Sequence, residues 1–262
     1  MLKIESISKT FQKGTINERK ALQDISLILN DGDFVTVIGS NGAGKSTLLN
    51  AIAGVFVVDT GKIYIDDKDI TNMSEHKRAN YIGRVFQNPL LGTAADMWIE
   101  ENLALAARRG KRRGLKPGIN DEERKKYLDI LSNFNLGLEN RMTTKVGLLS
   151  GGQRQALTLL MATLQKPDLL LLDEHTAALD PKTADKVLEL TNKIVTDNHL
   201  TTFMVTHNMK DALKYGNRLI MMDNGHIILD VSGKEKENLS VQDLLNKFEQ
   251  VGGVVNDNML LN

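Results

Sequence analysis

Residues 39–46 read Gly39-Ser40-Asn41-Gly42-Ala43-Gly44-Lys45-Ser46. This stretch fits the pattern G-x-x-x-x-G-K-[S/T]. A short apolar strand is predicted before it, at residues 33–39, and a helix after it, at 45–53. Glycines let the backbone curl so that its N–H groups point at phosphate oxygens, and the helix N-terminus adds positive potential. The stretch therefore predicts a phosphate-binding loop between a strand and a helix.

Three side chains of this region have predicted roles toward a nucleotide. Lys45 is expected to reach the β- and γ-phosphates, Ser46 to offer its hydroxyl to Mg²⁺, and Thr47 to contact the α- or β-phosphate. The alternative is a glycine-rich turn without a ligand, which the flanking strand and helix disfavour. The other residues expected to contact the nucleotide are Gly39, Ser40, Asn41, Gly42, Ala43 and Gly44.

Composition excludes several classes of protein. The 262 residues are 41% hydrophobic and 25% charged, which is an ordinary globular balance. The 33 basic and 33 acidic residues give a net charge of +0, so no general attraction to nucleic acid is indicated. The chain has no cysteine, which excludes disulfides and thiolate metal sites. No apolar run approaches the roughly 20 residues needed to span a bilayer. We therefore expect a soluble chain that needs partners for any work at a membrane.

Strands and helices are predicted to alternate along the chain, which implies a mostly parallel sheet. Further strands are expected at 2–8, 21–29, 62–65, 168–173 and 201–206, with a hairpin over 219–229. Further helices are expected at 96–108, 121–135, 151–165, 182–197 and 239–251. Asn120 or Asp121 is the predicted N-cap of the helix that begins near 121. Residues 251–262 are expected to be loose.

Two acidic residues follow the apolar run that ends at Leu172. A strand buried on both faces would carry Asp173 to the carboxyl edge of the sheet, beside the phosphate loop. There Asp173 could hold Mg²⁺ directly or through water. Glu174 would point toward the γ-phosphate and polarise the attacking water or accept its proton. The alternative, a strand that ends in two solvated acids, is weakened by the phosphate loop in the same chain.

A second anion-binding corner is predicted at Leu149-Ser150-Gly151-Gly152-Gln153, where a serine and two glycines open a helix. With this signature beside the phosphate loop and the acidic pair, the chain resembles the ABC ATPase family from about residue 2 to about 249. The resemblance implies a head-to-tail dimer that holds each ATP between one phosphate loop and the partner's signature. It assigns contacts with the ATP of the other subunit to Ser150, Gly151, Gly152 and Gln153.

The same resemblance assigns four further positions. Gln87 would contact Mg²⁺ and the water and link to a membrane subunit, and Asp180 would lie at the dimer interface. His207 would contact the γ-phosphate, although a lone histidine is more often structural or merely exposed. Phe11 stands where the family places an aromatic ring against adenine, with a core phenylalanine as the alternative.

The resemblance also implies the architecture. We expect a single ABC ATPase domain over 1–262, of the α/β class, with a P-loop NTPase (RecA-like) core and a mostly parallel sheet. Residues 1–87 and 149–250 would form the catalytic core with an antiparallel β subdomain. Residues 88–148 would form an inserted α-helical subdomain, and 251–262 a loose tail.

The implied function is an ATPase subunit of a bacterial importer at the cytoplasmic face of the membrane. It would power uptake of amino acids or similar solutes through transmembrane permease subunits, with a solute-binding protein in the same system. The alternative is a non-transport ABC ATPase acting on nucleic acid or ribosomes. A non-hydrolysing regulatory domain is disfavoured because every residue critical to hydrolysis is present: Lys45, Ser46, Gln87, Asp173, Glu174 and His207.

Two surface segments have open interpretations. Residues 89–98 are the candidate contact for the membrane subunits, although Trp98 could equally pack inside the helical lobe. The basic residues of 108–116 could touch anionic lipid or a partner, but a solvated surface loop is the favoured interpretation.

Overall fold

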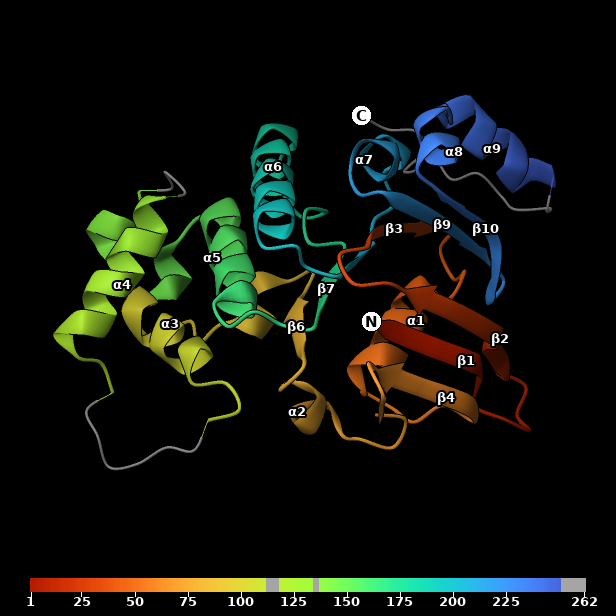
Figure 1. Cartoon of the computed structure of the whole chain (residues 1–262), viewed down its shortest axis with the longest axis horizontal. Helices are drawn as coiled ribbons and strands as arrows, with labels where there is room; N and C mark the ends of the chain where they lie inside the picture. Colours follow the sequence, from red (N-terminus) through yellow and green to blue (C-terminus); the bar gives the residue numbers. More distant parts are fainter. Residues whose placement is uncertain (112–117, 134–136, 251–262) are drawn as a thin grey trace.

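The computed structural model describes residues 1–111, 118–133 and 137–250, which form two sheets and a helical lobe (Figure 1). The predicted loose tail, 251–262, lies outside the described residues. The fold class that the sequence predicted is confirmed, with one parallel and one antiparallel sheet. No helix in the described part of the chain is long and apolar enough to cross a membrane.

The larger sheet has six strands in the order β10-β9-β3-β8-β7-β6. All neighbours in it are parallel except the hairpin of β9 and β10. Its strands are β3 (Phe34–Gly39), β6 (Ile82–Val85), β7 (Leu169–Asp173), β8 (Thr202–Val205), β9 (Arg218–Asp223) and β10 (His226–Ser232). Because the parallel strands share one direction, β3, β6, β7 and β8 end at the same edge of the sheet.

Strand β7 is buried on both faces because alternate residues face different cores. Leu169 and Leu171 belong to the core that contains α1 (Lys45–Ala53). Leu170 and Leu172 pack in the core formed with α5 (Gly151–Thr163) and α6 (Pro181–Asp197). This double burial explains the continuous apolar run in the sequence.

The smaller sheet is antiparallel, with the order β2-β1-β4-β5. Its strands are β1 (Leu2–Phe11), β2 (Arg19–Leu29), β4 (Thr60–Ile65) and β5 (Lys68–Asp69). The first two strands are longer than predicted. The first continues past residue 8 to Phe11, and the second begins before residue 21, at Arg19, since these two residues are paired. Backbone hydrogen bonds extend the pairing into polar residues, where the sequence shows no apolar periodicity.

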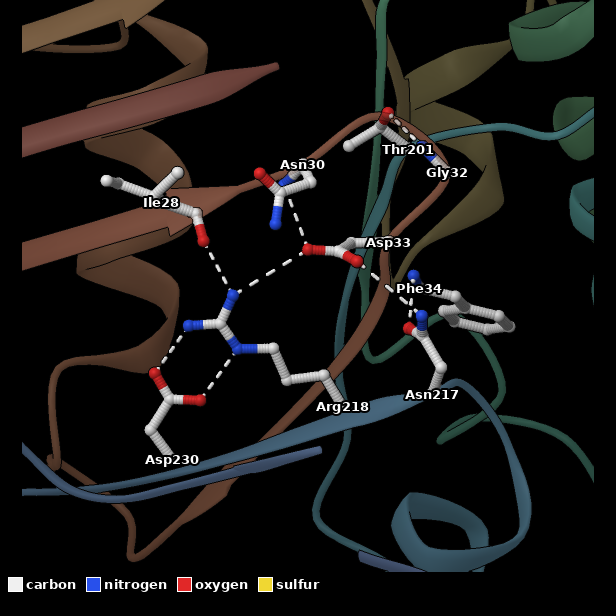
Figure 2. Close-up of polar contacts among 9 residues, drawn as sticks. All are labelled: Ile28, Asn30, Gly32, Asp33, Phe34, Thr201, Asn217, Arg218 and Asp230. Atoms are coloured by element: carbon white, nitrogen blue, oxygen red, sulfur yellow. Dashed lines mark hydrogen bonds and ion pairs between the residues drawn. The ribbon is translucent and has the colours of Figure 1, made fainter. Parts of the chain in front are cut away.

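A polar junction joins the two sheets where β2 ends and β3 and β9 begin (Figure 2). The Arg218 guanidinium donates two hydrogen bonds to Asp230, at 2.7 and 2.5 Å, and one to the Ile28 carbonyl at 2.6 Å. Its Nη1 also lies 3.7 Å from Asp33 Oδ2. The junction therefore fixes the start of β3, the strand that leads into the phosphate loop.

The helical lobe contains α3 (Ile99–Ala107) and α4 (Asp121–Ser132), with short 3₁₀ turns at Pro89–Gly92, Glu139–Arg141 and Val146–Leu148. Helix α5 packs against both this lobe and the parallel sheet. Asn120 caps α4 by accepting a hydrogen bond from the Glu123 N–H. The helix predicted from 96 begins at Ile99, since Trp98 has extended backbone angles. The predicted helix 121–135 ends at Ser132 within the described residues.

The start of the basic segment is packed, which corrects the prediction of a solvated loop at its first two residues. Arg108 pairs with Glu123 at 2.9 Å and so ties α3 to α4. Arg109 donates to the carbonyls of Ala162 at 3.2 Å and Gln165 at 2.9 Å, at the end of α5. Lys111 is exposed, and residues 112–116 lie outside the described residues.

The remaining helices are α2 (Glu75–Arg78), α7 (Met209–Lys214), α8 (Lys234–Glu237) and α9 (Val241–Gln250). Helix α9 packs against α7 through the buried side chains of Leu244 and Phe248. The helix predicted over 239–251 begins at Val241, because Ser240 and Asp243 cap its start, and it continues to Gln250, the last of the described residues.

Candidate functional site

The phosphate loop runs from the end of β3 to the start of α1, as predicted. Gly39 and Gly44 have φ values of 152° and 103°, in the region that favours glycine. A Cβ at Gly39 would lie 2.1 Å from the Met222 carbonyl oxygen, and one at Gly44 2.6 Å from the Ala21 carbonyl oxygen. The loop conformation therefore requires glycine at both positions.

Lys45 is the first residue of α1 and is only 5% exposed. Its Nζ donates to the carbonyls of Gly39 at 2.8 Å and Ser40 at 3.0 Å. Burial lowers the Lys45 pKa, and the nearby carboxylates of Glu174 and Asp173 act against that shift. An ammonium held by two carbonyls of the loop keeps a third proton for an anion.

Arg19 is a neighbour of the loop that the sequence analysis missed. Its Nη2 donates to the Gly42 carbonyl at 2.8 Å. A second contact of the loop joins Ser40 Oγ to Asp223 Oδ1 at 3.2 Å. Arg19 belongs to β2, far from the loop in sequence, so only the arrangement of the sheets brings it there.

Asp173 ends β7 with a side chain that is 17% exposed, and its Oδ2 lies 3.6 Å from Arg84 Nη2. Burial raises the Asp173 pKa, and the charge of Arg84 lowers it. Ser46, an exposed hydroxyl in the first turn of α1, is the second oxygen ligand predicted from the sequence. The described residues hold no group of three or more His, Cys, Asp or Glu that could bind a metal by themselves. One carboxylate and one hydroxyl fit Mg²⁺, which usually completes its shell with water and substrate phosphates.

Glu174 and His207 lie next to each other although 33 positions separate them in the sequence. His207 Nδ1 is 3.9 Å from Glu174 Oε2, because β7 and β8 are paired and end at the same edge. Glu174 has φ 42°, a left-handed conformation that is uncommon outside glycine, and its N–H donates to the Val205 carbonyl at 3.0 Å. Strained backbone of this kind concentrates at functional sites.

His175, directly after this pair, has a different character. It is 2% exposed, and its Nε2 lies 3.0 Å from the Thr191 hydroxyl of α6. Burial lowers the His175 pKa to about 4, so the ring is neutral at pH 7. His175 therefore holds the segment that follows the acidic pair against α6.

Gln87 is exposed and follows β6, the neighbour of β7. The preceding residue, Phe86, accepts a hydrogen bond on its carbonyl from Gln155 Nε2 at 3.1 Å. Gln155 belongs to α5, the helix that the signature opens. This bond connects the segment of Gln87 with the signature helix.

Phe11 ends β1 and is 36% exposed. Its ring meets Phe56 edge to face, with centroids 5.3 Å apart, and Lys9 Nζ lies 5.7 Å from its centroid. The alternative of a core phenylalanine is therefore wrong.

The signature forms the N-terminus of α5. Ser150 Oγ accepts from the Gln153 N–H at 3.3 Å, and Gln153 Oε1 accepts from the Ser150 N–H at 3.3 Å. A Cβ at Gly152 would lie 2.2 Å from Thr183 Cγ2, so α5 and the first turn of α6 touch at this glycine. Asp180 caps α6 by accepting from the Thr183 N–H at 3.1 Å and is exposed.

The structure thus brings some predicted residues together and leaves others apart. The phosphate loop, Asp173, Glu174 and His207 share the carboxyl edge of the large sheet. Helix α5, which carries the signature, lies across β6 and β7 from α1 (Figure 1). Within one chain, the signature therefore does not join the phosphate loop.

A groove of about 380 Å³ opens between the helical lobe and the parallel sheet. For Trp98, the sequence left two interpretations open, packing inside the helical lobe or contact with the membrane subunits. Its side chain is 43% exposed. The side chains that line the groove come from α1, α2, β6, α3 and α5 and include Glu75, Arg84, Phe86, Leu105, Arg109 and Met161.

A phosphate loop after β3, with an acidic pair at the end of β7, defines a P-loop nucleotide-hydrolysing protein. The sequence matches the ABC transporter family over residues 22–177, and the chain belongs to this family. It accordingly binds and hydrolyses ATP.

Two curated relatives extend over nearly the whole chain. A tyrosine transport ATP-binding protein of Clostridioides difficile (strain R20291) is 49% identical over 249 residues, covering 95% of this chain and 99% of that protein. A phosphonates import ATP-binding protein of Lactococcus lactis subsp. cremoris (strain SK11) is 30% identical, covering 90% and 94%. Among solved structures, a dimeric ATP-binding cassette in a post-hydrolysis state, bound to ADP and Pi, has a TM-score of 0.74 at 32% identity, covering 88% of this chain and 98% of that one.

Proposed function

We propose that this ATPase powers uptake of an amino acid of the tyrosine class through partner transmembrane subunits. The observation that carries the proposal is 49% identity to a tyrosine transport ATP-binding protein along 95% of the chain. Uptake is supported by the relative whose name specifies import of phosphonates. The alternative of an ATPase acting on nucleic acid or ribosomes gains no support from these relatives.

The residues at the carboxyl edge have the chemistry for hydrolysis. Lys45 would bind the β- and γ-phosphates, with the loop N–H groups of residues 39–44 and the Thr47 hydroxyl on the remaining oxygens. Asp173 and Ser46, with Gln87, would hold Mg²⁺, which neutralises phosphate charge when bound. Glu174 would take a proton from the attacking water. His207, whose Nδ1 lies 3.9 Å from Glu174 Oε2, would orient the γ-phosphate and the water. Phe11, at the exposed end of β1, would stack on adenine.

A second copy or a homologous ATPase subunit would complete each site. The signature at Ser150, Gly151, Gly152 and Gln153 forms a helix N-terminus, with Ser150 and Gly151 exposed, and such a terminus favours an anion such as the γ-phosphate. Asp180 is exposed at the start of the neighbouring helix α6 and would lie at the same interface. The separation of the signature from the phosphate loop within one chain supports a head-to-tail dimer.

The groove between the lobe and the sheet is where we place a helix of the transmembrane subunits. Gly92 lines this groove, and three apolar residues of the same segment 89–98 are exposed on the surface: Leu90 at 45%, Leu91 at 70% and Trp98 at 43%. Exposed apolar side chains around a groove are typical of protein interaction sites. A solute-binding protein outside the membrane and a position at the cytoplasmic face are further parts of this proposal.

Uptake of labelled tyrosine by cells that make the chain tests the proposal. Deleting the chain should abolish high-affinity uptake, and the wild-type chain should restore it. Glu174→Gln should not restore it, because it lacks the base, while His199→Asn, at an exposed site on the opposite edge of the sheet, should. Full tyrosine uptake without the chain would reject this substrate. Recovery by Glu174→Gln would reject the ATPase mechanism.

A further inference from the structure

Arg84 lies between the nucleotide site and the groove. It is in β6, with its backbone opposite Leu171 of β7. Its Nη2 is 3.6 Å from Asp173 Oδ2, and its Nη1 is 3.5 Å from Glu75 Oε1. Arg84 and Glu75 both line the groove, whereas Asp173 belongs to the carboxyl edge. One guanidinium is thus shared between a carboxylate of the site and a carboxylate of the groove.

The rest of the Arg84 side chain is held firmly except at one atom. Nη2 donates to Asn50 Oδ1 of α1 at 2.6 Å, and the guanidinium stacks 4.5 Å from the centroid of the Phe86 ring. Its Nε is buried and has no hydrogen-bond partner among the residues that the structure describes. Buried donors are rarely left unpaired, and such exceptions call for an explanation. A second arrangement, in which Nε also has a partner, would provide one.

We propose that Arg84 is a positioning residue that competes with Mg²⁺ for Asp173 and turns toward the groove when an acidic side chain of the docked partner helix enters it. The inference rests on the proposed function of the site and groove. A guanidinium 3.6 Å from a carboxylate oxygen weakens that carboxylate as a ligand for a divalent cation, since the two cations repel each other. Arg84 and Arg109 both line the groove, so an acidic side chain there would attract the Arg84 guanidinium and draw it away from Asp173.

The consequence is a reciprocal coupling between the partner and the metal. If the docked helix strengthens Mg²⁺ binding, Mg²⁺ must strengthen docking by the same factor. Glu75 already draws the guanidinium toward the groove, but its side chain is 53% exposed, so its attraction is screened by water.

Metal affinity of the isolated chain tests the competition. Mn²⁺, as a paramagnetic substitute for Mg²⁺, would be titrated into the chain saturated with ADP, and free Mn²⁺ followed by electron paramagnetic resonance. Arg84→Met should lower the Mn²⁺ dissociation constant about 3- to 10-fold, because a repelling charge is removed. Arg84→Lys keeps the positive charge and should lower the constant less than Arg84→Met does. Glu75→Gln should raise the constant about twofold, since Arg84 then turns fully to Asp173. An unchanged or weaker Mn²⁺ affinity in Arg84→Met would overturn the proposal.

Two controls separate this inference from the proposed function. ADP affinity without metal depends on the phosphate loop and should be the same in all four proteins; a chain that binds no ADP would contradict the function itself. In the complex with its transmembrane subunits, the wild-type chain should bind Mn²⁺ more tightly than it does alone, and Arg84→Met should show no such gain. An equal gain in both proteins would overturn the coupling through Arg84.

Discussion

In the proposed mechanism, hydrolysis depends on two single residues, Glu174 and His207. Their side chains lie 3.9 Å apart, so His207 can share the water or the γ-phosphate with the Glu174 carboxylate. We expect His207→Ala to lower kcat for ATP about 100-fold, as for the loss of a group that orients a reactant, with ATP affinity changed less than about threefold. Phosphate release and equilibrium ATP binding measure the two quantities. His199→Asn should match wild type in both, and a His207→Ala protein with normal kcat would remove His207 from the site.

His175 gives the fold a defined sensitivity to acid. Its pKa is about 4 in the folded chain and 6.5 when exposed, so the unfolded state binds the proton more readily. The contribution of His175 to stability is therefore complete above pH 6.5 and is lost as the pH falls toward 4. Urea unfolding at pH 7 and pH 5 should show a loss of about 2 kcal/mol from this residue. In His175→Gln the loss should be smaller by that amount, and an equal loss in both proteins would contradict the assignment.

Contact between α5 and α6 is the feature to test at the scale of elements. In Gly152→Ala the new methyl would lie 2.2 Å from Thr183 Cγ2, so either the Thr183 side chain must rotate or the two helix starts must separate. We expect a loss of about 1–3 kcal/mol in the free energy of unfolding. Adding Thr183→Ser removes the methyl that clashes and should restore most of the loss, because the cap from Asp180 to the Thr183 backbone remains. A single variant as stable as wild type would show that the contact is loose.

The elements show how far apolar periodicity predicts this fold. The buried strands and amphipathic helices are confirmed, since burial leaves a pattern in the sequence. The extension of β1 to Phe11 depends on backbone pairing, which leaves no pattern in the sequence. The packing of Arg108 and Arg109 depends on acceptors supplied by α4 and α5, and a basic run alone does not reveal them. A pair such as Arg108 and Glu123 has no signal without the three-dimensional arrangement.

The candidate site divides in the same way. The phosphate loop, the acidic pair and the signature are local motifs, and their positions on elements follow from the sequence. Arg19 and Arg84 contact the loop and Asp173 from other strands, so no local motif includes them. The roles of all site residues toward ATP stay predictions that the experiments here address.

A dimer that encloses ATP is the expectation at the scale of the whole molecule. Glu174→Gln should form a dimer in gel filtration with ATP and remain a monomer without it, since ATP is bound but not consumed. Adding Ser150→Asp should abolish this dimer. Aspartate keeps the N-cap of α5 but places a negative charge against the partner's γ-phosphate. Ser150→Thr serves as the control that keeps both the cap and the hydroxyl. A dimer that persists with Ser150→Asp would show that the signature does not contact ATP at the dimer interface.

The proposed mechanism depends above all on Glu174 activating water at an ATP held by the phosphate loop. Its most direct test is phosphate release from MgATP by wild type and Glu174→Gln, with bound ATP measured in the same samples. We expect steady release by wild type and at least a roughly 100-fold slower release by Glu174→Gln at equal ATP occupancy. Release at the wild-type rate from Glu174→Gln would contradict the claim and assign the water to another group.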